Sequence, residues 1–193
     1  MPDAQPNRHI EFFRGFLRNP KEVGSVVPSS PFLIRRVLKC GRIQQARTVV
    51  ELGPGTGVLT REILRRMPVD GRLIGVEISE DFAAILEAEF PDPPLRVFRG
   101  SATELERALA ENGGGKADLV VSGIPFSTMG SGDGRLTLEA AKRVLAPGGR
   151  FVAYQFRDHV RRMAEPVFGQ GEMVSGFWNI PPMKIYTWAR PDA

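Results

Sequence analysis

The stretch Glu51-Leu52-Gly53-Pro54-Gly55-Thr56-Gly57 decides the fold that this sequence predicts. It follows a β-branched run, Thr48–Leu52, that is typical of a buried strand, and it precedes a run with helical spacing, Leu59–Met67. Glycines let the backbone take a positive φ and let a ligand approach without a Cβ in the way. Because open α/β sheets bind ligands at the carboxyl ends of their strands, this turn is a candidate ligand loop.

The rest of the chain keeps alternating between strand and helix patterns. Further parallel strands are expected at Leu73–Ile78, Leu95–Phe98, Asp118–Ser122 and Arg150–Phe156. Further helices are expected at Glu80–Phe90, Glu104–Glu111 and Leu136–Ala146. Two final strands, Met173–Trp178 and Lys184–Ala189, indicate an antiparallel hairpin. The pattern predicts a doubly wound α/β fold with a mostly parallel seven-stranded sheet, a C-terminal antiparallel hairpin and N-terminal helices.

Residue types at the expected helix ends mark several boundaries. Ser30 followed by Pro31 has the pattern of a cap that opens an N-terminal helix. Ser79 is placed to cap the helix that follows the second strand, and Thr103 and Glu106 have the spacing of a capping box.

Two glycine-rich stretches mark the region around the last of these helices. Pro147–Gly149 is expected to end that helix before the last parallel strand. Gly130–Gly134 is expected to form a surface loop, or a lid over a substrate.

Composition excludes several classes of protein. The 193 residues are 42% hydrophobic and 25% charged, which suits one globular domain with its own core. No apolar run approaches the roughly 18 residues that span a bilayer, and the first residues lack the pattern of a signal peptide. Cys40 has no second cysteine to pair with, and His9 and His159 lack partners at metal-ligand spacing. We therefore expect a cytoplasmic protein without a metal site.

The basic charge is concentrated near the N-terminus. Residues 1–47 carry nine Lys or Arg and three Asp or Glu, a net +6, whereas residues 48–193 carry seventeen and nineteen, a net −2. The two parts add up to the +4 of the whole chain. This division predicts a basic segment at 1–47 attached to a nearly neutral domain at 48–193.

The glycine spacing separates three kinds of nucleotide site. A P-loop requires a Gly-Lys-Ser/Thr ending, and no lysine follows here. A dinucleotide fingerprint requires glycine at its sixth position, which is Val58 in this chain. The loop instead has Gly-x-Gly-x-Gly spacing with Glu51 before it, and a second acid, Glu77, lies at the end of the next strand. A carboxylate in that place can accept two hydrogen bonds from a ribose diol.

These residues resemble the class I S-adenosylmethionine-dependent methyltransferases. The resemblance implies that the glycine loop passes under the methionine part of the cofactor and that Glu77 binds both ribose hydroxyls. Ser101 stands where the family usually has an aspartate near the adenine amino group. Taken together, the cofactor contacts that the resemblance implies are Glu51, Gly53, Pro54, Gly55, Thr56, Gly57, Glu77, Ile78, Ser101, Ala102, Ser122 and Gly123.

The segment after the fourth strand is the candidate substrate site. Methyltransferases that act on nitrogen often carry an Asn- or Asp-x-Pro-Tyr/Phe motif there, and this chain has Gly123 at the polar position, followed by Ile124, Pro125 and Phe126. We expect those last three residues to shape an amine slot, although a tight turn followed by a core phenylalanine has the same pattern. Tyr154, near the end of the fifth strand, is a candidate for orienting the amine, or a core tyrosine.

Four segments together resemble the bacterial soluble phospholipid N-methyltransferases, which convert phosphatidylethanolamine to phosphatidylcholine. The segments are Phe12–Pro20, Gly24–Ser30, Ser122–Phe126 and Asn179–Tyr186. The resemblance implies an enzyme that methylates phosphatidylethanolamine and its mono- and dimethylated forms with S-adenosylmethionine. An RNA adenine dimethyltransferase is the alternative, because that family shares the glycine loop and a Pro-aromatic pair. A membrane-binding protein without turnover is a third possibility, which the intact glycine loop disfavours.

The N-terminal segment predicts a membrane contact from its own pattern. Apolar residues repeat at helical spacing between His9 and Asn19, with arginines on another side, as in helices that lie in the headgroup plane. A helix that packs its phenylalanines on the domain is the alternative. The candidate membrane or substrate residues are Phe12, Phe13, Arg14, Phe16, Arg18, Lys21, Ser29 and Ser30. We expect an anionic phospholipid membrane as the partner, no nucleic acid, and a peripheral location on the inner face of the membrane.

Overall fold

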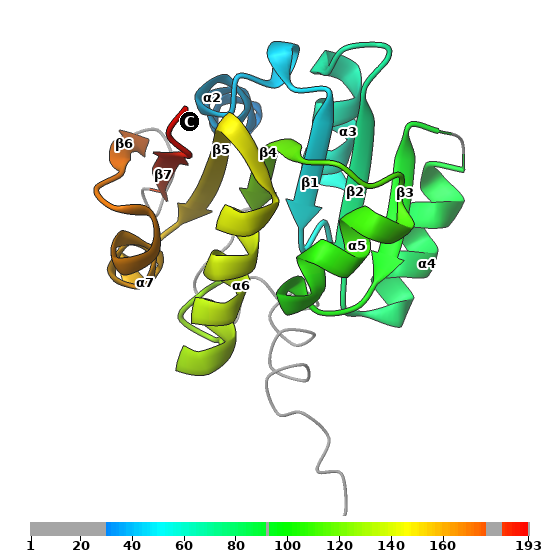
Figure 1. Ribbon diagram of the computed structural model, residues 1–193. Coiled ribbons are helices and arrows are strands. Elements are labelled where there is room, and N and C mark those ends of the chain that lie inside the picture. The colour runs from blue at the N-terminus through cyan, green and yellow to red at the C-terminus, as the bar shows by residue number, and fades with distance from the viewer. Residues whose placement is uncertain (1–29, 92, 177–182, 193) are drawn as a thin grey trace, which may run out of the picture.

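The computed structural model describes residues 30–91, 93–176 and 183–192, which form a seven-stranded sheet in the order β3-β2-β1-β4-β5-β7-β6 (Figure 1). The parallel strands are β1 (Thr48–Leu52), β2 (Arg72–Glu77), β3 (Leu95–Arg99), β4 (Ala117–Ser122) and β5 (Leu145–Gln155). Strand β7 (Met183–Ala189) runs antiparallel to both β5 and β6 (Glu172–Gly176). The predicted doubly wound α/β fold with its C-terminal antiparallel hairpin is confirmed.

Helices cover both faces of this sheet, as Figure 1 shows with α5 and α6 in front and α3 behind. The helices are α2 (Pro31–Cys40), α3 (Val58–Arg66), α4 (Glu80–Glu89), α5 (Leu105–Glu111), α6 (Ser131–Val144) and α7 (His159–Phe168), with short 3-10 turns at Ile43–Gln45 and Ala102–Glu104. Successive strand residues point to opposite faces, so Val50 joins the core under α5, α6 and α7, whereas Val49 joins the core under α2 and α3. The sheet is therefore buried on both sides, as parallel sheets are.

Helix α2 is part of the folded domain. Its residues Leu33, Ile34, Val37 and Leu38 are buried in the core on one face of the sheet. As predicted, Ser30 caps this helix, and its Oγ accepts a hydrogen bond of 3.2 Å from the N–H of Leu33. No described helix has the length and apolar character that would let it cross a bilayer.

Two of the predicted caps are wrong. Ser79 is the N-cap residue of α4, but its side chain makes no capping hydrogen bond; its hydroxyl is buried, and its N–H donates to Glu77. The capping box forms between Ser101 and Glu104. Thr103 lies inside that turn, where its own N–H donates to Ser101, so it cannot open the helix.

The region between β4 and β7 differs most from the prediction. Residues Ser131–Gly134 form the first turn of α6, not a loop. Gly134 allows close packing there, because a Cβ on it would collide with the side chain of Met163 in α7. Helix α6 ends at Val144, and Pro147–Gly149 lie within β5, where the register against β4 shifts. The sequence pattern gave no prediction for α7.

Candidate cofactor and substrate site

The glycine loop lies at the carboxyl edge of the sheet, between β1 and α3. Its three glycines have left-handed backbone angles, with φ of 67° at Gly53, 57° at Gly55 and 77° at Gly57. At Gly57, which begins α3, an added Cβ would also lie 2.8 Å from the ring of Phe90. The loop shape that the sequence predicted therefore requires glycine for both conformation and space.

Glu77 holds this loop against the end of β2. Its two carboxylate oxygens accept hydrogen bonds from the N–H of Gly55 at 3.0 Å and from the N–H of Ser79 at 2.9 Å. Burial raises the pKa of Glu77, and the N–H groups of Ser79, Gly55 and Ile78 act against that rise. A carboxylate has about four acceptor positions, so Glu77 can still accept from a ligand diol.

The neighbours of Glu77 fit a nucleoside. The hydroxyl of Ser79 is buried and has no hydrogen-bond partner among the described residues, although a buried polar atom normally has one. Ile78 is 38% exposed at the end of β2, which offers an apolar surface for a flat ring. Ala102 is buried in the 3-10 turn that follows β3. The hydroxyl of Ser101 accepts from the N–H and the hydroxyl of Thr103, so its contact with an adenine stays a prediction.

Glu51 lies beneath the loop in β1. It is buried, and the hydroxyl of Thr60 in α3 donates a hydrogen bond of 2.7 Å to it. Burial raises the pKa of Glu51 to about 8; the Thr60 hydrogen bond lowers it and the charge of Glu77 raises it further. Glu51 is thus mainly protonated at neutral pH. No local pattern indicated Thr60, which faces Glu51 only because α3 folds back over β1.

Hydrogen bonds fix the segment after β4. The N–H of Gly123 donates to the carbonyl of Leu52 at 3.2 Å, and the N–H of Ile124 donates to the hydroxyl of Ser122 at 3.3 Å. The amide of Gln155, at the end of β5, donates to the carbonyl of Ile124 at 2.6 Å. Gln155 was not among the predicted site residues, although a buried polar residue at the carboxyl end of a strand is a usable signal.

Phe126 does not line a slot. It is 1% exposed, and its ring packs edge-on against Phe151 with the ring centroids 6.4 Å apart. The expectation that Phe126 shapes an amine site is wrong, because α6 and α7 cover the face of the sheet to which it points. Ile124 and Pro125 are only partly buried and remain available to a substrate.

Tyr154 lies on the other face, where it packs against the core under α2 and α3. Its strand is held on both sides, by β4 and by the pairing of Tyr154 with Ile185 in β7. Burial raises the pKa of its phenol well above the ordinary range, and the charge of Glu51 adds to the rise. The phenol is thus neutral at physiological pH.

The remaining predicted residues lie mostly outside the described part of the chain. These are Phe12, Phe13, Arg14, Phe16, Arg18, Lys21 and Ser29. Ser30 is described, and its side chain caps α2.

Comparison with known sequences gives two kinds of relative. Residues 49–149 match a family described as a methyltransferase domain. The chain is 33% identical over 177 residues to an ornithine lipid N-methyltransferase of Singulisphaera acidiphila, which covers 91% of this chain and 92% of the relative. It is also 33% identical over 113 residues to a ribosomal RNA small subunit methyltransferase A of Acidithiobacillus ferrooxidans, but this match covers only 58% of the chain and 41% of the relative.

Solved structures share the fold at low sequence identity. An O-methyltransferase from Bacillus cereus, in complex with S-adenosylhomocysteine, has a TM-score of 0.71 at 16% identity and covers 97% of this chain and 93% of its own. The N-methyltransferase NodS from Bradyrhizobium japonicum, also with S-adenosylhomocysteine, has a TM-score of 0.69 at 16% identity and covers 96% and 100%. These likenesses confirm the fold.

Replacing Glu51 by glutamine should make the stability of the protein less dependent on pH. The unfolded carboxyl titrates near its ordinary value of 4.5 and the folded one at about 8. Between these values the folded state binds the extra proton, so wild-type stability falls as pH rises, by up to about 1.4 kcal/mol per pH unit, and levels off above pH 8. Urea unfolding between pH 5 and 9 measures the free energy of unfolding of both proteins. Parallel curves for wild type and Glu51→Gln would contradict the assignment.

Proposed function

The chain belongs to the class I S-adenosylmethionine-dependent methyltransferases, and on that premise we propose that it methylates the amine of a membrane lipid. The lipid resemblance of the sequence favours phosphatidylethanolamine as the acceptor, whereas its similar relative in Singulisphaera acidiphila is named for an ornithine lipid. Both lipids carry a primary amine in the headgroup. The proposal is N-methylation of such an amine, with phosphatidylethanolamine and its methylated forms as the expected series.

One observation carries this proposal: the likeness to a lipid N-methyltransferase extends over nearly the full length of both chains. The likeness to ribosomal RNA methyltransferases covers less than half of their length. The site agrees with this difference. Gly123 has no side chain with which to hold a base amine, and Phe126 is buried in the core, where it cannot stack on a base.

The cofactor would lie across the carboxyl edge of the sheet. The glycine loop would pass under its methionine part, Glu77 would accept the ribose hydroxyls, and Ile78 would cover the adenine. The unpartnered hydroxyl of Ser79 lies beside this path and could donate to it. When bound, S-adenosylmethionine supplies a methyl group that its sulfonium already activates.

The protein has to position the amine and keep it unprotonated. A primary ammonium has an ordinary pKa of about 10.4, so most of it is protonated at neutral pH. Apolar walls and a nearby positive charge both lower that pKa. Ile124 and Pro125 would provide such walls at the end of β4. This removes the need for a strong base and leaves orientation as the main task of the site.

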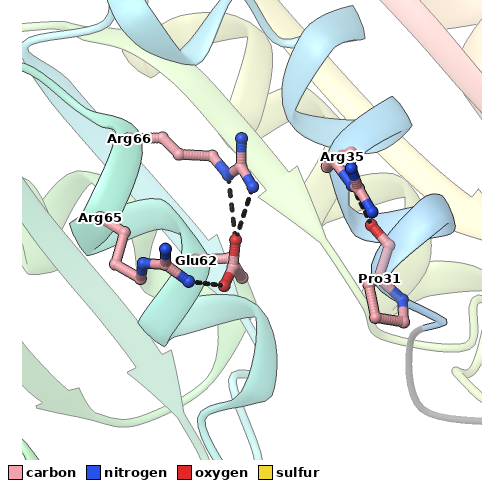
Figure 2. Close-up of polar contacts among 5 residues, drawn as sticks. All are labelled: Pro31, Arg35, Glu62, Arg65 and Arg66. Atoms are coloured by element: carbon pink, nitrogen blue, oxygen red, sulfur yellow. Dashed lines mark hydrogen bonds and ion pairs between the residues drawn. The ribbon is translucent and has the colours of Figure 1, made fainter.

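A basic outer surface on α2 and α3 supports a membrane partner. Arg35 and Lys39 are exposed on α2, and no acidic residue occurs between positions 30 and 47. Figure 2 shows Arg35 on α2 and, on the neighbouring α3, Arg65 and Arg66, which share the single carboxylate of Glu62. One carboxylate cannot neutralise two guanidinium groups, so this surface keeps a net positive charge. Basic residues near an anionic membrane contribute about 1 kcal/mol each.

Methyl transfer to lipid tests the proposed function directly. Methyl-labelled S-adenosylmethionine is supplied with vesicles that contain phosphatidylethanolamine, with vesicles that contain ornithine lipid, or with structured RNA. We expect label in the lipid, and the two vesicle types show which headgroup is preferred. Label in RNA alone would favour the adenine-methylating alternative and overturn the proposal.

Replacing Glu77 by glutamine should weaken cofactor binding. The glutamine amide has the same size as the carboxylate, but only its oxygen can accept a hydrogen bond. Hydrogen bonds to a charged group contribute about 1.5–3 kcal/mol. Titration calorimetry with S-adenosylhomocysteine should show affinity lower by roughly 10- to 100-fold. Glu87→Gln is the matched control, since Glu87 is an exposed acid that pairs with Arg99. Equal affinities for the two variants would exclude Glu77 from the site.

Replacing Phe12, Phe13 and Phe16 together by serine should weaken binding to anionic vesicles. If these side chains insert at the headgroup level, their loss removes apolar area from the membrane and leaves the cofactor site intact. Vesicle flotation and calorimetry with S-adenosylhomocysteine measure the two properties. Ile85→Ser, at an exposed apolar position of α4, is the control. Unchanged flotation of the triple variant would mean that the phenylalanines pack on the domain.

A further inference from the structure

The side chain of Tyr154 fills the space that a side chain at position 123 would need. A Cβ built on Gly123 would lie 2.6 Å from the hydroxyl oxygen of Tyr154 and 3.3 Å from the ring carbon that bears it. The next nearest atom, the carbonyl oxygen of Gly53, is 3.7 Å away. The phenol hydroxyl of Tyr154 thus lies where residue 123 would place its side chain.

The strand pairing holds this hydroxyl in place, and none of the described residues is its hydrogen-bond partner. The ring of Tyr154 packs on the α2 and α3 side of the sheet, and β4 and β7 fix its strand from both sides. No described residue makes a hydrogen bond to this hydroxyl, whereas the hydroxyl of Tyr186 on β7 donates to Asp158. A fixed phenol with free acceptor positions therefore points to the end of β4, beside the glycine loop.

We propose that the hydroxyl oxygen of Tyr154 takes the place of the missing polar side chain at Gly123 and accepts a hydrogen bond from the N–H of the lipid amine. This inference rests on the proposed function and names the group that orients its substrate. It also explains why residue 123 is a glycine, since any side chain at this position would push the phenol away.

A neutral phenol can orient the amine without competing for its proton. In the transfer, the nitrogen lone pair forms the bond to the methyl carbon, and the carbon–sulfur bond breaks with its electron pair on sulfur. The positive charge passes to nitrogen, which then releases a proton to water. Tyr154 keeps its own proton throughout. Because its raised pKa keeps the phenol protonated across the physiological pH range, Tyr154 does not act as a base toward the amine, while its oxygen can still accept a hydrogen bond.

The number of N–H groups on the acceptor gives a sharp test. The unprotonated primary and monomethyl amines carry an N–H that Tyr154 can accept, but the dimethyl amine carries none. Tyr154→Phe should therefore lower kcat/KM about three- to tenfold with phosphatidylethanolamine and its monomethyl form, the size of one neutral hydrogen bond. It should leave the dimethyl form unaffected. Tyr186→Phe, the matched control, should not distinguish the three acceptors.

A second measurement tests the shared space without any turnover. Gly123→Ala should lower the thermal unfolding midpoint in wild type, because its methyl group meets the phenol oxygen. In the Tyr154→Phe background the nearest contact becomes 3.3 Å, so the same substitution should lower the midpoint less. Affinity for S-adenosylhomocysteine should stay within about twofold of wild type in Tyr154→Phe.

The outcomes separate this inference from the proposed function. Wild type that labels neither these three lipids nor ornithine lipid would overturn both the proposed function and this inference. Wild type that methylates all three, together with a Tyr154→Phe variant that is equally active on each or equally impaired on each, would overturn the role of Tyr154 alone. Equal effects of Gly123→Ala in the two backgrounds would contradict the shared space.

Discussion

The hydrogen bonds that Glu77 accepts from Gly55 and Ser79 hold the carboxyl edge of the sheet together. They join the glycine loop after β1 to the end of β2 and to the turn that starts α4. The loop reaches this carboxylate through glycines with left-handed angles, which other residues rarely adopt. A buried acid between two backbone donors is thus both the anchor of the loop and the acceptor left for a ligand. The cofactor proposal and the placement of Ile78 depend on this arrangement.

Local sequence chemistry was enough to predict most of the fold. Strand β1 was predicted with its observed bounds, Thr48–Leu52, because a β-branched run ends at an obligatory glycine turn. Prediction failed where tertiary packing decides the structure. Helix α7 contains Pro166, which weakens its local pattern, and packing of Val160 and Ala164 into the core stabilises it. Helix α6 starts in a glycine-rich stretch because the glycines let it approach α7.

The residues of the site likewise divide into those that local sequence predicts and those that depend on tertiary packing. Glu77 could be predicted because its position at the end of a strand is a property of the local sequence. The relation between Gly123 and Tyr154 could not, because it depends on the register between β4 and β5, in which Ser122 lies beside Ala153. Phe126 was misplaced since the motif fixes its position in the chain but not the face that neighbouring helices cover. Contacts between strands that are far apart in the sequence can be identified only once the pairing of the strands in the sheet is known.

The packing of α2 has a consequence for where the autonomously folding unit begins. Four of its apolar side chains, Leu33, Ile34, Val37 and Leu38, fill one face of the sheet. Burial of each such side chain contributes about 1.5–3 kcal/mol, and a domain has a net stability of only about 5–15 kcal/mol. A polypeptide that started at Thr48 would therefore lose a stabilising free energy comparable to the net stability of the whole domain. The smallest stable piece of the enzyme starts ahead of the sheet, so the helix that bears the basic surface cannot be separated from the catalytic body.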